Sequence, residues 1–302
     1  MKTILIFILC LACQLTLMAQ NNTPPGFLWQ VNINGSGFSL AGSIHAGKQD
    51  QGPLPQAYLD AYDEADYLIL ELQDDFETLE KMIFKYAEKD SLKEDQYLNN
   101  YLSQESMDIL EELFEGREEM LLRYYRHEGW LLNMAISGMK SRLIGYDPEL
   151  AIDKYFHEMA TKDQKLILGL DRIETQLRLF EFEAPLVQQV QIIESASRGA
   201  AQQARSEKPL FDFYFNQDTE SFREAFLSSL NFDNPQVKQM YDLVFTNRNR
   251  AWVEKLIELS SSQPGTYFML VGSGHYFGPG NIRELLEAEG YPVKPYSQRS
   301  DF

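Results

Sequence analysis

Two tetrapeptides of the form Gly-x-x-His lie near opposite ends of the chain, at Gly42–His45 and Gly272–His275. Each follows an apolar run that predicts a buried strand, and together they hold two of the four histidines in the sequence. A histidine placed where a strand ends, behind a glycine that lets the backbone turn, can serve as a ligand or base in a crevice. The duplication therefore predicts one site built from both ends of the sequence.

Glu71 ends a third apolar run and adds a carboxylate to the two histidines. In open α/β sheets ligands bind at the carboxyl ends of the strands, so His45, Glu71 and His275 could converge there. Two imidazoles and one carboxylate can bind a catalytic divalent metal such as manganese, cobalt or zinc, which suits hydrolysis. The alternative for each motif is a turn with a hydrogen-bonded histidine, and Glu71 could simply pair with Arg248.

A predicted helix, Pro235–Leu259, carries Arg248 and Asn249 inside its apolar stripe. A buried guanidinium must be paired, so we expect Arg248 to face a carboxylate or a bound anion. With Asn249 it would steady a developing oxyanion or orient the carboxylates of the site. The alternative is an ion pair that only holds the helix in place.

The surrounding pattern predicts an α/β (α+β) fold with a central mixed sheet. Two related halves, each reading strand, Gly-x-x-His, helix, strand, build this sheet, and a large helical insertion at about residues 76–140 separates them. A turn at Asn34-Gly35 predicts a hairpin, because its positions need positive φ. Strands are expected at Leu28–Ile33, Phe38–Ile44, Asp66–Glu71, Leu143–Tyr146, Lys165–Leu168, Thr266–Val271 and Tyr291–Pro295.

Residues 1–20 have the pattern of a signal peptide, with Lys2 before an apolar core and a cleavage region that ends near Ala19. The stretch is too short for a membrane span, so we expect an exported protein, periplasmic or secreted. Cys13 raises the alternative of a lipoprotein. Both cysteines of the chain, Cys10 and Cys13, lie in this segment, which leaves the mature chain without disulfide or thiolate chemistry.

The mature chain is strongly acidic, with 26 basic against 45 acidic residues once Lys2 is removed. Such a surface attracts cations and repels nucleic acid and anionic membranes. We therefore expect neither nucleic acid nor a membrane as a partner. We expect residues 21–302 to form a single domain with no membrane span, acting on a peptide or small-molecule substrate.

The order of these motifs resembles the TraB/GumN family, which includes the Tiki proteases of animals. The resemblance covers roughly residues 28 to 296. The first motif is matched by Leu40-Ala41-Gly42-Ser43-Ile44-His45-Ala46-Gly47, followed by the strand that ends in Glu71. The later motifs are matched by Gly145-Tyr146-Asp147, Gly169-Leu170-Asp171 through Gln176, Arg248-Asn249, and Val271-Gly272-Ser273-Gly274-His275 through Tyr291 and Val293.

The resemblance implies a Tiki-like metal-dependent peptidase. Its metal ligands would be His45, His275 and Glu71, with Glu71, Arg248 and Asn249 as catalytic residues. Asp147 and Asp171 are further candidates, as partners of Arg248, and so are the motif glycines Gly42 and Gly272. Asp171 departs from the family pattern, which usually has a glutamate there.

We therefore expect a secreted metal-dependent hydrolase in which metal-bound water attacks a carbonyl. The alternative is a non-catalytic module of the same fold that holds a ligand such as haem. A third possibility is an exported interaction protein whose motifs only preserve the fold. Metal dependence separates the first hypothesis from the other two.

Overall fold

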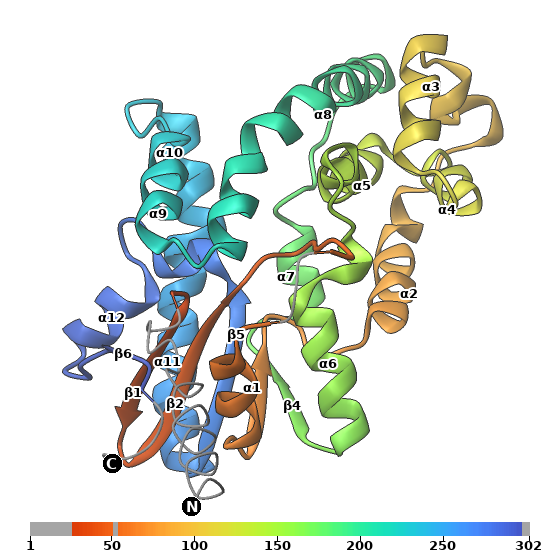
Figure 1. The fold of residues 1–302 in the computed structure, drawn as a ribbon. Coiled ribbons are helices and arrows are strands. Elements are labelled where there is room, and N and C mark those ends of the chain that lie inside the picture. Colours follow the sequence, from red (N-terminus) through yellow and green to blue (C-terminus); the bar gives the residue numbers. More distant parts are fainter. Residues whose placement is uncertain (1–25, 51–53, 298–302) are drawn as a thin grey trace, which may run out of the picture.

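The computed structural model describes residues 26–50 and 54–297. The predicted signal peptide, with Cys10 and Cys13, lies outside the described residues. The described part is a six-stranded mixed sheet with helices around it and a helical lobe at one end (Figure 1). The expected α+β class with a central mixed sheet is confirmed. None of the helices in residues 26–50 and 54–297 is long and apolar enough to cross a membrane.

The sheet has the strand order β4-β3-β5-β2-β1-β6. Its core of β4, β3, β5 and β2 is parallel, whereas β1 pairs antiparallel with β2 and β6 antiparallel with β1. The last long strand of the chain, β5, therefore lies between two strands from its first quarter. The strands are β1 (Leu28–Ile33), β2 (Ser36–Ser43), β3 (Tyr67–Leu70), β4 (Leu166–Gly169), β5 (Thr266–Gly272) and β6 (Lys294–Pro295).

The predicted hairpin is confirmed between β1 and β2, where Asn34 and Gly35 have φ of 51° and 91°. Both values lie in the left-handed region that asparagine and glycine tolerate best. The two related halves differ in their last strand. In the first half β3 joins the parallel core, whereas in the second half β6 has only two residues at the sheet's edge.

Most of the helices lie in the connections between β3 and β4 and between β4 and β5. The first connection holds the helical insertion, and α6 leads back to the sheet. The helices are α1 (Gln56–Asp63), α2 (Phe76–Ala87), α3 (Gln104–Leu113), α4 (Glu118–Tyr124), α5 (Gly129–Met139), α6 (Ile152–Asp163), α7 (Ile173–Leu177), α8 (Leu186–Phe215), α9 (Thr219–Ser228), α10 (Pro235–Tyr241), α11 (Asn247–Ser262) and α12 (Ile282–Ala288).

Two hydrophobic cores hold these elements together. The sheet core contains the strands with α1, α6, α11 and α12, and the helical core contains α2 to α5. The long helix α8 connects them, because Val190 and Ile193 pack in the helical core and Tyr214 in the sheet core. In Figure 1 the helical lobe lies beyond the same end of the sheet at which β3 and β5 finish.

Two local predictions need correction. The expected strand Leu143–Tyr146 is wrong, because Lys140–Ile144 is a 3₁₀ helix that continues α5. Gly145 ends it with φ of 83°, and Tyr146 then stacks on Phe211 with ring centroids 4.5 Å apart. The expected helix Pro235–Leu259 is interrupted by a π-helical segment, Asp242–Thr246, between α10 and α11.

Candidate active site

Three parallel strand ends bring the predicted donors together. In the β2–β5 pairing Gly42 lies opposite Val271 and Ser43 opposite Gly272, so the two motifs leave the sheet side by side. Because β3 is also parallel to β5, Glu71 follows at the same edge. The Glu71 Oε1 atom lies 3.8 Å from His45 Nε2 and 3.9 Å from His275 Nε2. The structure thus places the three residues around one point.

Glu71 is held on both carboxylate oxygens. Its Oε2 accepts hydrogen bonds from Arg248 Nη2 at 2.5 Å and from Gln176 Nε2 at 3.2 Å. Its Oε1 accepts from the backbone N–H of Gly272 at 3.0 Å and faces the histidines. Burial raises the pKa of the Glu71 carboxyl, but Arg248, the two histidines and the Gly272 N–H together outweigh this effect and hold the pKa well below its usual range. Glu71 is therefore ionised at neutral pH.

Arg248 is buried between two carboxylates, as predicted from its place in the apolar stripe. Its side chain is 10% exposed, and besides Glu71 it donates from Nε to Asp171 Oδ2 at 2.8 Å. The guanidinium also lies 4.6 Å above the Trp252 ring, whose Nε1 donates to Asp171 Oδ1 at 2.8 Å. Arg248 follows the π-helical segment, and single π turns of this kind are frequent at functional sites.

Asp147, the other predicted partner of Arg248, makes its contacts elsewhere. Its carboxylate caps the 3₁₀ helix Pro148–Leu150 and lies 3.9 Å from Arg142. Its backbone exchanges hydrogen bonds with Gly47, at 3.0 and 2.6 Å. Asp147 therefore fixes the loop that follows His45 through its backbone, and the structure gives it no contact with Arg248.

Asn249 orients His275. The Nδ1–H group of His275 donates to Asn249 Oδ1 at 2.6 Å, and Asn249 Nδ2 donates to the Gly280 carbonyl at 3.0 Å. This pair of contacts leaves Nε2 of His275 unprotonated, with its lone pair 3.5 Å from the Arg248 Nη1 donor and on the side of Glu71. Burial lowers the pKa of His275 to about 3, although the Glu71 charge opposes it. Asn249 thus contacts a histidine and not the oxyanion position or carboxylates predicted from the sequence, because both its amide atoms are engaged with His275 and Gly280.

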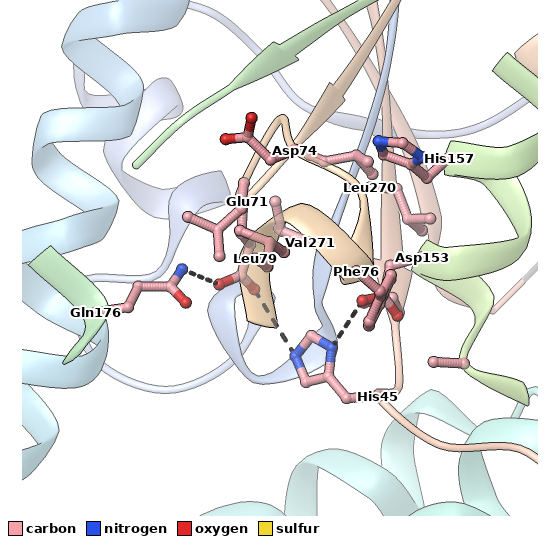
Figure 2. Close-up of a pocket in the computed structure, with 14 residues that line it drawn as sticks. His45, Glu71, Asp74, Phe76, Leu79, Asp153, His157, Gln176, Leu270 and Val271 are labelled. Atoms are coloured by element: carbon pink, nitrogen blue, oxygen red, sulfur yellow. Dashed lines mark hydrogen bonds and ion pairs between the residues drawn. The ribbon is translucent and has the colours of Figure 1, made fainter. Parts of the chain in front are cut away.

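His45 lies on the open side of the site, with 62% of its side chain exposed. Its Nδ1 donates to Asp153 Oδ2 at 3.3 Å, which turns Nε2 toward Glu71 (Figure 2). Partial desolvation lowers the pKa of His45. The charges of Asp153 and Glu71 and the hydrogen bond to Asp153 outweigh this effect and raise the pKa to about 9. Sequence reasoning missed Asp153, which lies in the first turn of α6 and belongs to no recognised motif.

The two motif glycines leave room that a side chain would fill. A Cβ atom on Gly272 would lie 3.1 Å from His45 Nε2 and 3.3 Å from Glu71 Oε1. A Cβ atom on Gly42 would lie 2.6 Å from Ser273 Oγ. Ser273 is buried and donates to the carbonyl of Ser43 at 2.9 Å, which agrees with a packing role for the motif serines. Gly272 thus keeps the space among the donors open, and Gly42 lets the motifs pack together.

A pocket of about 280 Å³ opens beside the donors. His45, Glu71 and Gln176 line it, and in Figure 2 dashed lines join Glu71 to His45 and Gln176. His157 also lines the pocket, and its Nε2 lies 3.2 Å from the Gln73 carbonyl. Within residues 26–50 and 54–297, no group of three or more His, Cys, Asp or Glu side chains has the arrangement of a metal centre.

The fold and site define a mixed-sheet α/β protein with paired Gly-x-x-His motifs on neighbouring parallel strands. Residues 27–295 match the TraB/PrgY/gumN family, and the chain belongs to that family. It is 25% identical over 249 residues to the uncharacterized protein YbaP of Escherichia coli strain K12, covering 82% of this chain and 87% of that protein. It is also 25% identical over 247 residues to the uncharacterized protein YbaP of Shigella flexneri, covering 82% and 86% respectively. No solved structure matches the chain.

Proposed function

We propose that the protein is an exported metal-dependent hydrolase that cleaves peptide bonds. The observation that carries the proposal is the convergence of His45 Nε2 and His275 Nε2 on one oxygen of Glu71, at 3.8 and 3.9 Å. A divalent metal bound by these atoms would activate water and polarise a carbonyl, which are the two needs of peptide hydrolysis. The export part of the proposal rests on residues 1–20.

The residues suit such a metal in donor type, and the three side chains would have to move closer together to reach the spacing of a metal centre. Ligand atoms around a tetrahedral zinc ion lie about 3.3 Å apart. The distances from Glu71 Oε1 to Nε2 of His45 and of His275, 3.8 and 3.9 Å, are slightly longer. The absent side chain at Gly272 leaves room beside His45 Nε2 and Glu71 Oε1. The exposed ring of His45 could approach Glu71 by a small rotation about its contact with Asp153, and the gap to the buried His275 would close through a shift of the Glu71 carboxylate.

The neighbouring residues prepare these donors in the way that metal sites require. Asn249 fixes the tautomer of His275, and Asp153 accepts from Nδ1 of His45 and so directs its Nε2 toward Glu71, as outer carboxylates and amides do for ligating histidines. Arg248 and Gln176 occupy Oε2 of Glu71 and so leave Oε1 for the site. Arg248 also supplies a fixed positive charge 3.5 Å from His275 Nε2, where it could stabilise negative charge that develops on a carbonyl oxygen.

Metal analysis and a cleavage assay test the proposal directly. The protein purified without its first 20 residues should turn over members of a peptide library with manganese, cobalt or zinc, and a chelator should stop the reaction reversibly. His45→Ala and His275→Ala should each abolish turnover and lower the bound metal. Glu71→Gln should retain metal but lose rate if Glu71 acts as a base, and should lose both if it is a ligand.

Three results would contradict the proposal. The first is a chelated protein that retains its activity, and the second is full turnover by both histidine variants. The third is the absence of peptide turnover with every metal tested. Haem binding through His45 or His275, detected by its absorption spectrum, would then favour the non-catalytic binding module.

A further inference from the structure

The pocket beside Glu71 lies where the two hydrophobic cores meet. One wall comes from the strand ends Leu70, Leu270 and Val271, which belong to the sheet core. Another part of the lining comes from Leu72 and Leu79, which pack against the helical core. Ligand sites are common at such seams between packed units.

Half of the residues that line this pocket are apolar, and the candidate catalytic residues line it as well. Phe76, the first residue of α2, lies at the pocket with 41% of its surface exposed. His45 and Glu71 line the same pocket on its polar side (Figure 2). A ligand that buries an apolar group against Leu79 therefore places the adjoining polar group next to His45 and Glu71.

The volume and charge of the pocket restrict that apolar group. At about 280 Å³ the pocket is smaller than the usual site for a drug-sized molecule, and it suits one large side chain with its adjoining backbone. Three carboxylates, Glu71, Asp74 and Asp153, line it as well. An acidic side chain would meet like charges there and be rejected.

We propose that this pocket is a specificity subsite that accepts a large apolar side chain, such as leucine, methionine or phenylalanine, next to the scissile peptide bond. The inference rests on the proposed function, because it assigns the substrate class of the same site. Burial of a leucine side chain in place of asparagine should improve kcat/KM about ten- to a hundredfold.

Matched peptides test the subsite. Each pair of peptides differs only by leucine or asparagine at one position beside the scissile bond. The pairs are assayed with the metal-loaded protein and with its Phe76→Gln and Leu79→Gln variants. Leu122→Gln is the control. Leu122 lies on α4 and is 52% exposed, so its substitution makes the same chemical change outside the pocket. The wild type and the control should prefer leucine. The pocket variants should lose at least fivefold of that preference, because the KM for the leucine peptide should rise more than the KM for the asparagine peptide.

A binding experiment separates failure of this inference from failure of the proposed function. If no peptide is cleaved, saturable binding of N-acetyl-leucinamide and N-acetyl-asparaginamide is compared by calorimetry and by NMR. Tighter binding of the leucine compound that weakens in Phe76→Gln, with an unchanged circular dichroism spectrum, supports the subsite even then. Equal binding of the two compounds, or a preference that both pocket variants retain, overturns it.

Discussion

The guanidinium of Arg248 and the carboxylate of Glu71 lie 2.5 Å apart although 177 residues separate them in the chain. This pair links α11 to the end of β3, and Asp171 extends it from the end of β4. Three segments that are remote in sequence are thus fixed to one another at the sheet edge from which the histidines project.

Replacement of Arg248 by methionine should destabilise the fold strongly. The variant leaves Glu71 and Asp171 without their counter-charge, and breaking a buried pair from one side typically costs about 3–5 kcal/mol. Urea unfolding measures the effect. Arg223→Met is the matched control, since Arg223 pairs with Glu220 on the exposed surface of α9 and its loss should cost less than about 1 kcal/mol. Equal stabilities of the two variants would contradict a structural role for the buried pair.

Replacement of Asn249 by leucine should release the tautomer of His275. The side chain keeps roughly its size but no longer accepts from Nδ1–H, so the proton is free to move to Nε2. Nitrogen-15 NMR of the imidazole should show Nδ1–H in the wild type and a mixture in the variant. Metal affinity should fall about 10- to 100-fold, as for other outer partners of ligating histidines. A variant with the wild-type tautomer and affinity would remove Asn249 from this role.

Alanine at Gly272 should block the site without unfolding the protein. Its Cβ would lie 3.1 Å from His45 Nε2 and 3.3 Å from Glu71 Oε1, so it would fill the space among the donors. Turnover and bound metal should fall at least about tenfold while the melting temperature changes by only a few degrees. Gly199→Ala is the control, because nothing lies within 4 Å of that Cβ on α8, and it should stabilise the protein by about 0.5–1 kcal/mol. Full activity of the Gly272 variant would show that this space is not used.

The stability of the metal-free protein should depend on pH through His275. Its pKa is lowered from 6.5 to about 3 by burial, so between these values the unfolded chain binds a proton that the folded chain does not. The contribution of His275 to stability should therefore decrease as the pH drops below 6.5, by at most about 1.4 kcal/mol per pH unit. Above pH 6.5 this contribution should not change with pH. Urea titrations at several pH values give the free energy of unfolding as a function of pH. This free energy should depend less steeply on pH below 6.5 in His275→Leu than in the wild type. Identical slopes would show that His275 is not buried in its neutral form.

The sequence was sufficient for the parts of the site that local patterns specify. Apolar runs before Gly42, Glu71 and Gly272 predicted three strand ends, and one polar residue in a helical stripe was enough to predict a buried, paired Arg248. Parallel pairing then brought these residues together, because carboxyl ends of parallel strands share an edge.

Other features depend on contacts that no local pattern reveals. Asp153 meets His45 across 108 residues, and nothing in the first turn of α6 distinguishes it from an ordinary surface acid. Leu143 to Tyr146 read as a strand because the segment is short and apolar, but its apolar residues pack against α8 as a continuation of α5. The π-helical segment before Arg248 is likewise invisible in the apolar periodicity, which continues across it.

The central position of β5 in the sheet determines at what point in chain synthesis the site can form. β2 and β3 do not pair with each other but each pairs with β5, and His275 follows that strand near the end of the chain. A nascent polypeptide that has not yet reached residue 275 lacks both the strand that aligns the first motif and the second histidine. The edge of the sheet that brings His45, Glu71 and His275 together can therefore form only after β5 and the second motif have been synthesised, so the ribosome completes the candidate site late in translation.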